Sequence, residues 1–117
     1  MGWTKPRLIA YKGEWFDDSF DHAGPACYEL GTGGPKGGKI EWHYVGETRN
    51  ECGRIACYAR NGSHLSGIID KHLREGWHLY YRACACSSKE AAKQRQDNLL
   101  SRYNYDWNIM LNRDDED

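Results

Sequence analysis

The chain has 117 residues, of which 39% are hydrophobic and 28% charged, and its formal net charge is −1. This length supports one domain with a modest core. No apolar stretch approaches the roughly 20 residues of a membrane-spanning helix, and the first residues do not read as a signal peptide. The composition therefore excludes a helical membrane protein, and we expect a cytoplasmic one.

The charge is unevenly distributed. Four acidic residues, 114–117, end the chain, and without them the remainder carries a formal charge of +3. Runs of like charge usually form solvated tails, so we assign residues 113–117 to an acidic tail. A mildly basic domain permits DNA binding but does not demonstrate it.

The first half of the chain indicates an N-terminal arm followed by two strands. Residues 1–24 are aromatic and mixed in charge, and we expect an ordered arm. Strands are predicted over 25–30 and 40–46, where apolar and polar residues alternate well enough for pairing. Residues 31–39 between them contain five glycines and a proline, which predicts a loop.

The second half indicates helices and one further strand. Helical spacing of apolar residues predicts a helix over 51–61 that ends at Gly62. A second helix, 64–75, is expected to begin at an N-cap, Ser63, and to end at Gly76. The aromatic segment 77–86 predicts a third strand.

A third helix completes the domain. Ser87 and Glu90 form a capping box, and the helix is expected to run to about Tyr103. Over residues 25–112 the order is β-β-α-α-β-α. We therefore predict an α+β domain, with a small three-stranded antiparallel sheet flanked by three helices.

The chain has five cysteines, an odd number that in a cytoplasmic protein indicates reduced thiols. Four of them, Cys52, Cys57, Cys84 and Cys86, could be imagined as a zinc site. Their spacing matches no ordinary zinc pattern, so small buried side chains are the favoured interpretation.

One polar residue interrupts the apolar stripe of the third helix. The stripe consists of Ala92, Gln96, Leu99, Leu100 and Tyr103. Gln96 is either a hydrogen-bonded residue of the core edge or a residue that faces a catalytic surface. Helical periodicity alone favours the core-edge interpretation.

Other polar residues point to a phosphate-binding surface. Tyr28 and Tyr44 lie on the paired strands, and Arg54 and Tyr58 lie one helical turn apart. A guanidinium near phenols is a plausible clamp for phosphate. Taken singly, each tyrosine is more simply a packing residue and Arg54 a surface ion pair.

As an ordered set, these residues resemble the GIY-YIG nuclease family. Ala26-Cys27-Tyr28 is similar to the first signature and Tyr44-Val45-Gly46 to the second, with only the tyrosines and the final glycine matching literally. Arg54, eight residues after Gly46, stands where the family has its arginine. Tyr58 stands where members carry tyrosine or histidine.

The match continues on the third helix. Residues 92–100 resemble the family's glutamate helix, and Asn108 matches its terminal asparagine, twelve residues past Gln96. The resemblance covers about residues 25–110. It implies the β-β-α-α-β-α fold and a metal-dependent endonuclease that hydrolyses phosphodiester bonds of DNA with one divalent ion, Mg²⁺ or Mn²⁺.

The resemblance also implies roles for the matched residues. A glutamate at position 96 would hold the ion, Tyr44 would act as general base, and Arg54 would contact the phosphate. Tyr28 and Tyr58 would orient the water or the phosphate. Asn108 would fix the arrangement of strand and helix around the site.

Two positions depart from the family. Gln96 is nearly isosteric with glutamate but neutral, so it should hold Mg²⁺ poorly. Either the change was engineered to stop turnover or the chain is a natural relative that only binds DNA; retention of the other site positions favours the engineered change. Glu47 replaces a lysine found in several members, and Arg49 would take over its contact with DNA.

Specificity must come from outside the shared core. The N-terminal arm and the 31–39 segment, with Lys36 and Lys39, are the available candidates for contacts to DNA, as in a compact restriction-type or phage-type endonuclease. One site cuts one strand, so double-strand cleavage would need a homodimer or sequential nicking. For His43 and His64, near the site in sequence, a surface or packing role is the simpler interpretation.

Two other functions remain open. A catalytically inactive DNA-binding module is directly supported by Gln96. A structural or interaction protein would use the aromatic residues as an interface and would show no salt-sensitive affinity for DNA.

Overall fold

The computed structural model describes residues 2–11, 14–15, 24–34, 37–59 and 64–109. The acidic tail, Lys36, the expected stop at Gly62 and the expected cap at Ser63 lie outside these residues, as does most of the second half of the N-terminal arm. In the described part of the chain, no helix is long and apolar enough to cross a bilayer.

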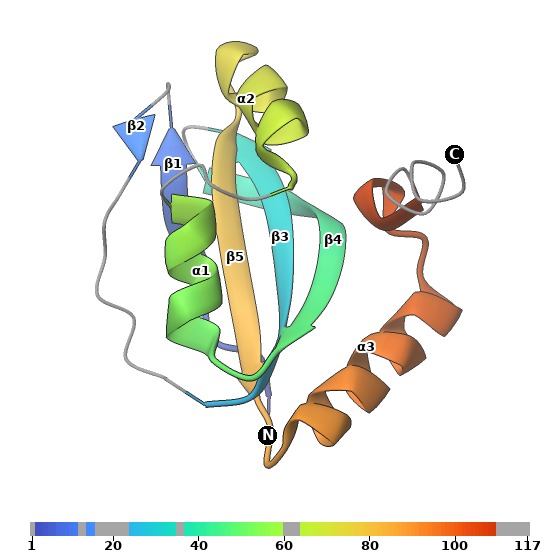
Figure 1. Ribbon diagram of the computed structural model, residues 1–117. Helices are drawn as coiled ribbons and strands as arrows, with labels where there is room; N and C mark the ends of the chain where they lie inside the picture. The colour runs from blue at the N-terminus through green and yellow to red at the C-terminus, as the bar shows by residue number, and fades with distance from the viewer. Residues whose placement is uncertain (1, 12–13, 16–23, 35–36, 60–63, 110–117) are drawn as a thin grey trace.

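The domain is an α+β fold built on an antiparallel sheet (Figure 1). In chain order its elements are β1 (Arg7–Tyr11), β2 (Glu14–Trp15), β3 (Ala26–Gly34), β4 (Gly37–Thr48), α1 (Glu51–Ala59), α2 (Ser66–Arg74), β5 (His78–Ala85) and α3 (Lys89–Arg102). From β3 onward the order is β-β-α-α-β-α, which confirms the predicted fold class.

The sheet has more strands than expected. Its order is β2-β1-β5-β3-β4, so the described chain forms five strands where the sequence predicted three. The additional strands come from the N-terminal arm, where β1 pairs antiparallel with β5. The sequence did not predict β1, because residues 1–24 show no regular alternation of apolar and polar side chains.

The prediction of a loop over 31–39 was wrong. β3 continues to Gly34 and β4 begins at Gly37, so the glycines belong to a hairpin. At Gly31 a Cβ atom would lie 2.5 Å from the carbonyl oxygen of Glu41 and 2.8 Å from the Trp42 ring. Glycine is required there because β4 leaves no room for a side chain at this point, next to an irregularity in the register of the two strands.

Two of the predicted helix starts also needed correction. The N-cap of α3 is Ser88 rather than Ser87, and its hydroxyl accepts a hydrogen bond from the Ala91 amide at 3.1 Å. α2 begins at Ser66 after Leu65, whose side chain makes no capping hydrogen bond. Propensity locates a helix end only to within a residue or two, which explains both shifts.

Each face of the sheet carries its own core. On one face, residues of β3, β4 and β5 pack against α1 and α2 around Tyr28, Leu30 and Ile69. On the other face, Cys27 and Val45 pack with Leu99 of α3 and with Tyr105. Since neighbouring residues of a strand point to opposite faces, β3 and β4 contribute to both cores.

The stripe predicted for α3 is only partly buried. Ala92 is fully buried and Leu99 is half-buried, but Leu100 is 37% exposed and Tyr103 is 58% exposed. α3 ends at Arg102, and the chain that follows returns to the outer edge of β4 at Asn108.

Residues 105–108 form a C-terminal strap at the free edge of β4, and from Asp106 onward they are helical. The Asn108 side chain makes the two hydrogen bonds that a neighbouring strand would make to Val45. Its Oδ1 accepts from the Val45 amide at 2.9 Å, and its Nδ2 donates to the Val45 carbonyl at 3.0 Å. The ring of Trp107, 1% exposed, enters the core that holds Tyr28. The strap therefore connects the two faces of the sheet.

The strap predicts a large cost for removing one amide. Asn108→Ala leaves the N–H and C=O of buried Val45 without partners, so we expect it to lower the free energy of unfolding by about 2–4 kcal/mol. Urea denaturation measures this value. Asn98→Ala, an exposed position on α3, is the matched control and should change stability by less than about 0.5 kcal/mol. Equal effects of the two substitutions would show that the strap contributes no stability.

Candidate phosphodiester-binding site

Two tyrosines from adjacent strands meet on the face covered by α1. Tyr28 on β3 lies opposite Gly46 on β4, and Tyr44 lies opposite Leu30. The ring centroids of Tyr28 and Tyr44 are 6.2 Å apart. A Cβ atom at Gly46 would come within 2.5 Å of the Tyr28 hydroxyl end, so the glycine after Val45 makes room for this ring.

Helix α1 adds a third tyrosine and an arginine. Ile55 and Tyr58, three residues apart and fully buried, turn this helix toward the sheet. The hydroxyls of Tyr58 and Tyr28 are 2.9 Å apart and hydrogen-bonded. We call Tyr28, Tyr44 and Tyr58 the tyrosine cluster.

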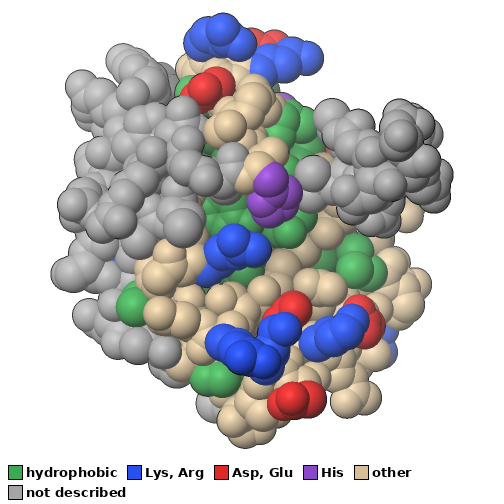
Figure 2. Space-filling view, in the orientation of Figure 1, with side chains coloured by type: hydrophobic (Ala, Val, Ile, Leu, Met, Phe, Trp, Pro, Cys, Tyr) green, Lys and Arg blue, Asp and Glu red, His purple; other side chains and the backbone are tan. Residues whose placement is uncertain are grey.

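Arg54 supplies the positive charge of this surface. It lies four residues before Tyr58 and is exposed, while its guanidinium interacts with the hydroxyl of Tyr28 and is close enough to influence the pKa of all three phenols. The face seen from the α1 side carries a histidine and basic side chains between α1 and α3, with acidic side chains among the lower ones (Figure 2). His64 meets the Tyr44 ring edge-on at 6.0 Å.

Burial keeps the tyrosine cluster neutral. Burial raises the pKa of Tyr28, Tyr44 and Tyr58, and Arg54 opposes this shift at all three. The phenols are therefore hydrogen-bond donors at neutral pH, beside one permanent cation. Phenolic donors around a guanidinium suit an oxyanion such as a phosphodiester.

Comparison with known proteins gives the family. The model of the GIY-YIG domain-containing proteins matches residues 20–116, most of the chain. No curated protein and no solved structure matched.

This chain belongs to the GIY-YIG family. Members of this family are endonucleases that act on DNA, which places the chain among the nucleases.

The structure brings together four of the residues predicted from the GIY-YIG signatures. Tyr28, Tyr44, Arg54 and Tyr58 form one surface. Asn108 does not belong to this surface; its bonds to Val45 hold the strand that carries Tyr44.

The remaining predicted DNA contacts lie elsewhere or outside the described residues. Arg49 is exposed just before α1. Lys39 is exposed and lines a pocket with Trp42 and Tyr105, whose neighbours belong to the opposite face of the sheet. Lys36 is not described. Glu47 is 3.9 Å from the Lys89 ammonium of α3, which partly offsets its negative charge.

The family's metal position does not fit a divalent ion in this chain. Gln96 is half-buried on α3 and offers only a neutral amide oxygen. Mg²⁺ is usually bound through one or two carboxylates together with waters and substrate phosphates. Among the described residues, no three His, Cys, Asp or Glu side chains are placed to hold a metal.

The cysteines considered for zinc are mostly packing residues where they are described. Cys84 is buried, and Cys86 packs beside Cys27 in the second core. Burial raises the pKa of the Cys86 thiol, which favours the neutral thiol over the thiolate that a metal needs. The side chain of Cys57 lies outside the described part.

Sequence reasoning missed the contacts that hold His43, the residue before Tyr44 on β4. His43 is held by two hydrogen bonds, with Nε2 2.9 Å from Thr32 Oγ1 and Nδ1 2.8 Å from Asp106 Oδ1. Its ring also stacks on Trp107 at 4.7 Å. The packing role expected for His43 is therefore correct. The pairing with Asp106 spans 63 residues and left no signal in local sequence.

The buried phenols predict alkaline instability. Their folded pKa values lie above the ordinary value of 10, so between about pH 10 and the folded values only the unfolded chain loses these protons. Stability should be constant below pH 9 and fall above pH 10. Each such tyrosine contributes up to about 1.4 kcal/mol per pH unit.

Urea unfolding between pH 8 and 11 tests this dependence. Tyr58→Phe should reduce the slope above pH 10, whereas Tyr103→Phe, which removes an exposed hydroxyl, serves as the control. A slope that Tyr58→Phe leaves unchanged would contradict the assignment.

Proposed function

We propose that this chain is a DNA endonuclease domain that binds the scissile phosphodiester at Arg54 and the tyrosine cluster, and that Gln96 limits its hydrolysis. The observation that carries the proposal is the convergence of four GIY-YIG side chains from β3, β4 and α1 on one surface. Buried phenols joined by a hydrogen bond form a preorganised donor set, which suits an anionic ligand better than a flexible surface does.

In this proposal each residue has one task. Arg54 binds the non-bridging phosphate oxygens, and the Tyr28–Tyr58 pair donates to the same oxygens or to the attacking water. Tyr44 is the general base in its phenolate form, which takes a proton from the attacking water. Burial opposes formation of this phenolate, so the charge of Arg54 has to stabilise it before the water attacks.

Residue 96 decides whether hydrolysis follows binding. The Gln96 amide supplies no charge to offset the charge that develops on the phosphate. A carboxylate in its place would allow Mg²⁺ or Mn²⁺ to take part. A single site of this kind nicks one strand, and a homodimer is needed only for simultaneous cleavage of both.

A second function is favoured by the same residue. If Gln96 is a natural feature of the chain, the tyrosine cluster and Arg54 bind DNA without cutting it. The two proposals share the binding surface and differ only in what a carboxylate at position 96 would do.

Nicking of supercoiled plasmid in Mg²⁺ tests the endonuclease. We expect Gln96→Glu to produce relaxed circles at least about 100-fold faster than the unchanged chain, and EDTA to stop the reaction. Gln94→Glu adds the same charge at an exposed position of α3 and should remain inactive. If Gln96→Glu is also inactive while DNA still binds, the binding module is the correct function.

The salt dependence of DNA affinity tests the phosphate contact. Arg54→Ala should weaken binding to unrelated sequences alike and reduce the slope of log K against log salt by about one. Arg74→Ala removes an exposed arginine of α2 and is the control. Equal slopes for Arg54→Ala and the unchanged chain would exclude this contact.

A further inference from the structure

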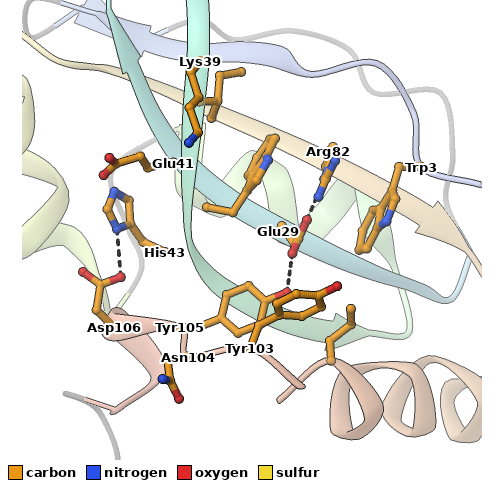
Figure 3. A pocket seen from close by; sticks show the side chains of 13 residues that line it. Trp3, Glu29, Lys39, Glu41, His43, Arg82, Tyr103, Asn104, Tyr105 and Asp106 are labelled. Atoms are coloured by element: carbon orange, nitrogen blue, oxygen red, sulfur yellow. Dashed lines mark hydrogen bonds and ion pairs between the residues drawn. The ribbon is translucent and has the colours of Figure 1, made fainter. Parts of the chain in front are cut away.

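A pocket of about 830 Å³ lies between the sheet and the segment that follows α3 (Figure 3). Its walls come from β3, β4 and β5 and from residues 103–106, with Trp3 from the N-terminal arm at one side. This volume is in the range of small-ligand sites. It is separate from the tyrosine cluster, none of whose members lines it.

The inner wall is built from a buried ion pair. Glu29 is 2% exposed and accepts hydrogen bonds from Arg82 Nε at 2.5 Å and from the hydroxyl of Tyr105. The guanidinium carbon of Arg82 lies 4.7 Å from the Trp3 ring centroid and 4.5 Å from that of Trp42. These contacts fix the wall before any ligand arrives.

The rim offers free hydrogen-bonding groups and an aromatic ring. Glu41 and Asn104 are exposed, and the Asp106 side chain is 62% exposed although one of its oxygens is bonded to His43. Tyr103 is 58% exposed, and Lys39 reaches over the opposite side of the pocket (Figure 3).

The charges of the pocket disfavour a phosphate. Three carboxylates, Glu29, Glu41 and Asp106, face two cations, Lys39 and Arg82. A planar ligand with amino groups fits better, because carboxylates accept from N–H and aromatic rings stack on planar rings. Bases that carry an exocyclic amino group, such as cytosine, have both features.

The pocket and the tyrosine cluster share the edge strand of the sheet. Glu41, Trp42 and His43, which line the pocket, immediately precede Tyr44 on β4. Trp42 and Tyr105 belong to the core on the opposite face from Tyr44. Since β4 is the last strand, a base of DNA bound at Arg54 would reach the pocket around this edge.

We propose that this pocket binds an amino-bearing nucleobase of the DNA substrate. The base stacks on Tyr103, and its amino group donates to Glu41 or Asp106. The proposal rests on the proposed function for the identity of the polymer, but the recognition of the base depends only on the pocket. It would give the endonuclease a preference for bases near the cleaved bond.

Saturation-transfer NMR with free nucleosides tests the pocket without any phosphate. Deoxycytidine, which carries an amino group, should bind at least fivefold more tightly than thymidine, which presents a carbonyl oxygen in its place. Tyr103→Ala should weaken deoxycytidine at least fivefold, and Glu41→Gln should reduce the preference over thymidine. Both positions are exposed, so both variants should keep the circular dichroism spectrum of the unchanged chain.

Trp77→Ala is the matched control, since Trp77 is 45% exposed and does not line the pocket. Equal affinity for the two nucleosides, or deoxycytidine binding that Tyr103→Ala leaves unchanged, would overturn the proposal. If deoxycytidine still binds to Arg54→Ala while Gln96→Glu does not cut DNA, only the endonuclease is refuted. If Gln96→Glu cuts DNA while deoxycytidine does not bind, only the pocket is refuted.

Discussion

The bidentate bond between the Asn108 amide and the backbone of Val45 holds the site together. β4 is the last strand of the sheet, so its outer N–H and C=O groups would otherwise lack partners. Asn108 pairs with one residue of this edge, and His43, two residues earlier, is tied to Asp106. Tyr44 stands between these two attachments and is thereby held in place.

The same arrangement explains how one strand serves two surfaces. β4 presents Tyr44 to the face covered by α1 and Val45 to the face covered by α3. The strap crosses from one face to the other, with Tyr105 bonded to Glu29 on one side and Trp107 buried on the other. Loosening the strap would disturb both surfaces at once, because each depends on where the edge of β4 lies.

Sequence reasoning identified the fold class and the tyrosine cluster because these depend on local patterns. Strand alternation, helical spacing and the offsets from Gly46 to Arg54 and Tyr58 are readable along the chain. The resemblance gave Asn108 a role in fixing strand and helix, but the bond of His43 to Asp106 and the ion pair of Glu29 with Arg82 were not predicted. Each joins residues more than 50 positions apart. The glycines after Leu30 led to the wrong prediction of a loop, because a crowded position between paired strands and a loop both favour glycine.

The first strand of the sheet lies outside the stretch that defines the family. The family match begins at residue 20, whereas β1 spans Arg7–Tyr11 and pairs with residues 79–81 of β5. Thr4 adds two hydrogen bonds to the Ala83 backbone: its amide donates to the Ala83 carbonyl, and its hydroxyl accepts from the Ala83 amide. A fragment trimmed to the family boundaries would leave one edge of β5 without its partner strand and open to pairing with another molecule, so we expect the stable folding unit to extend beyond the family match.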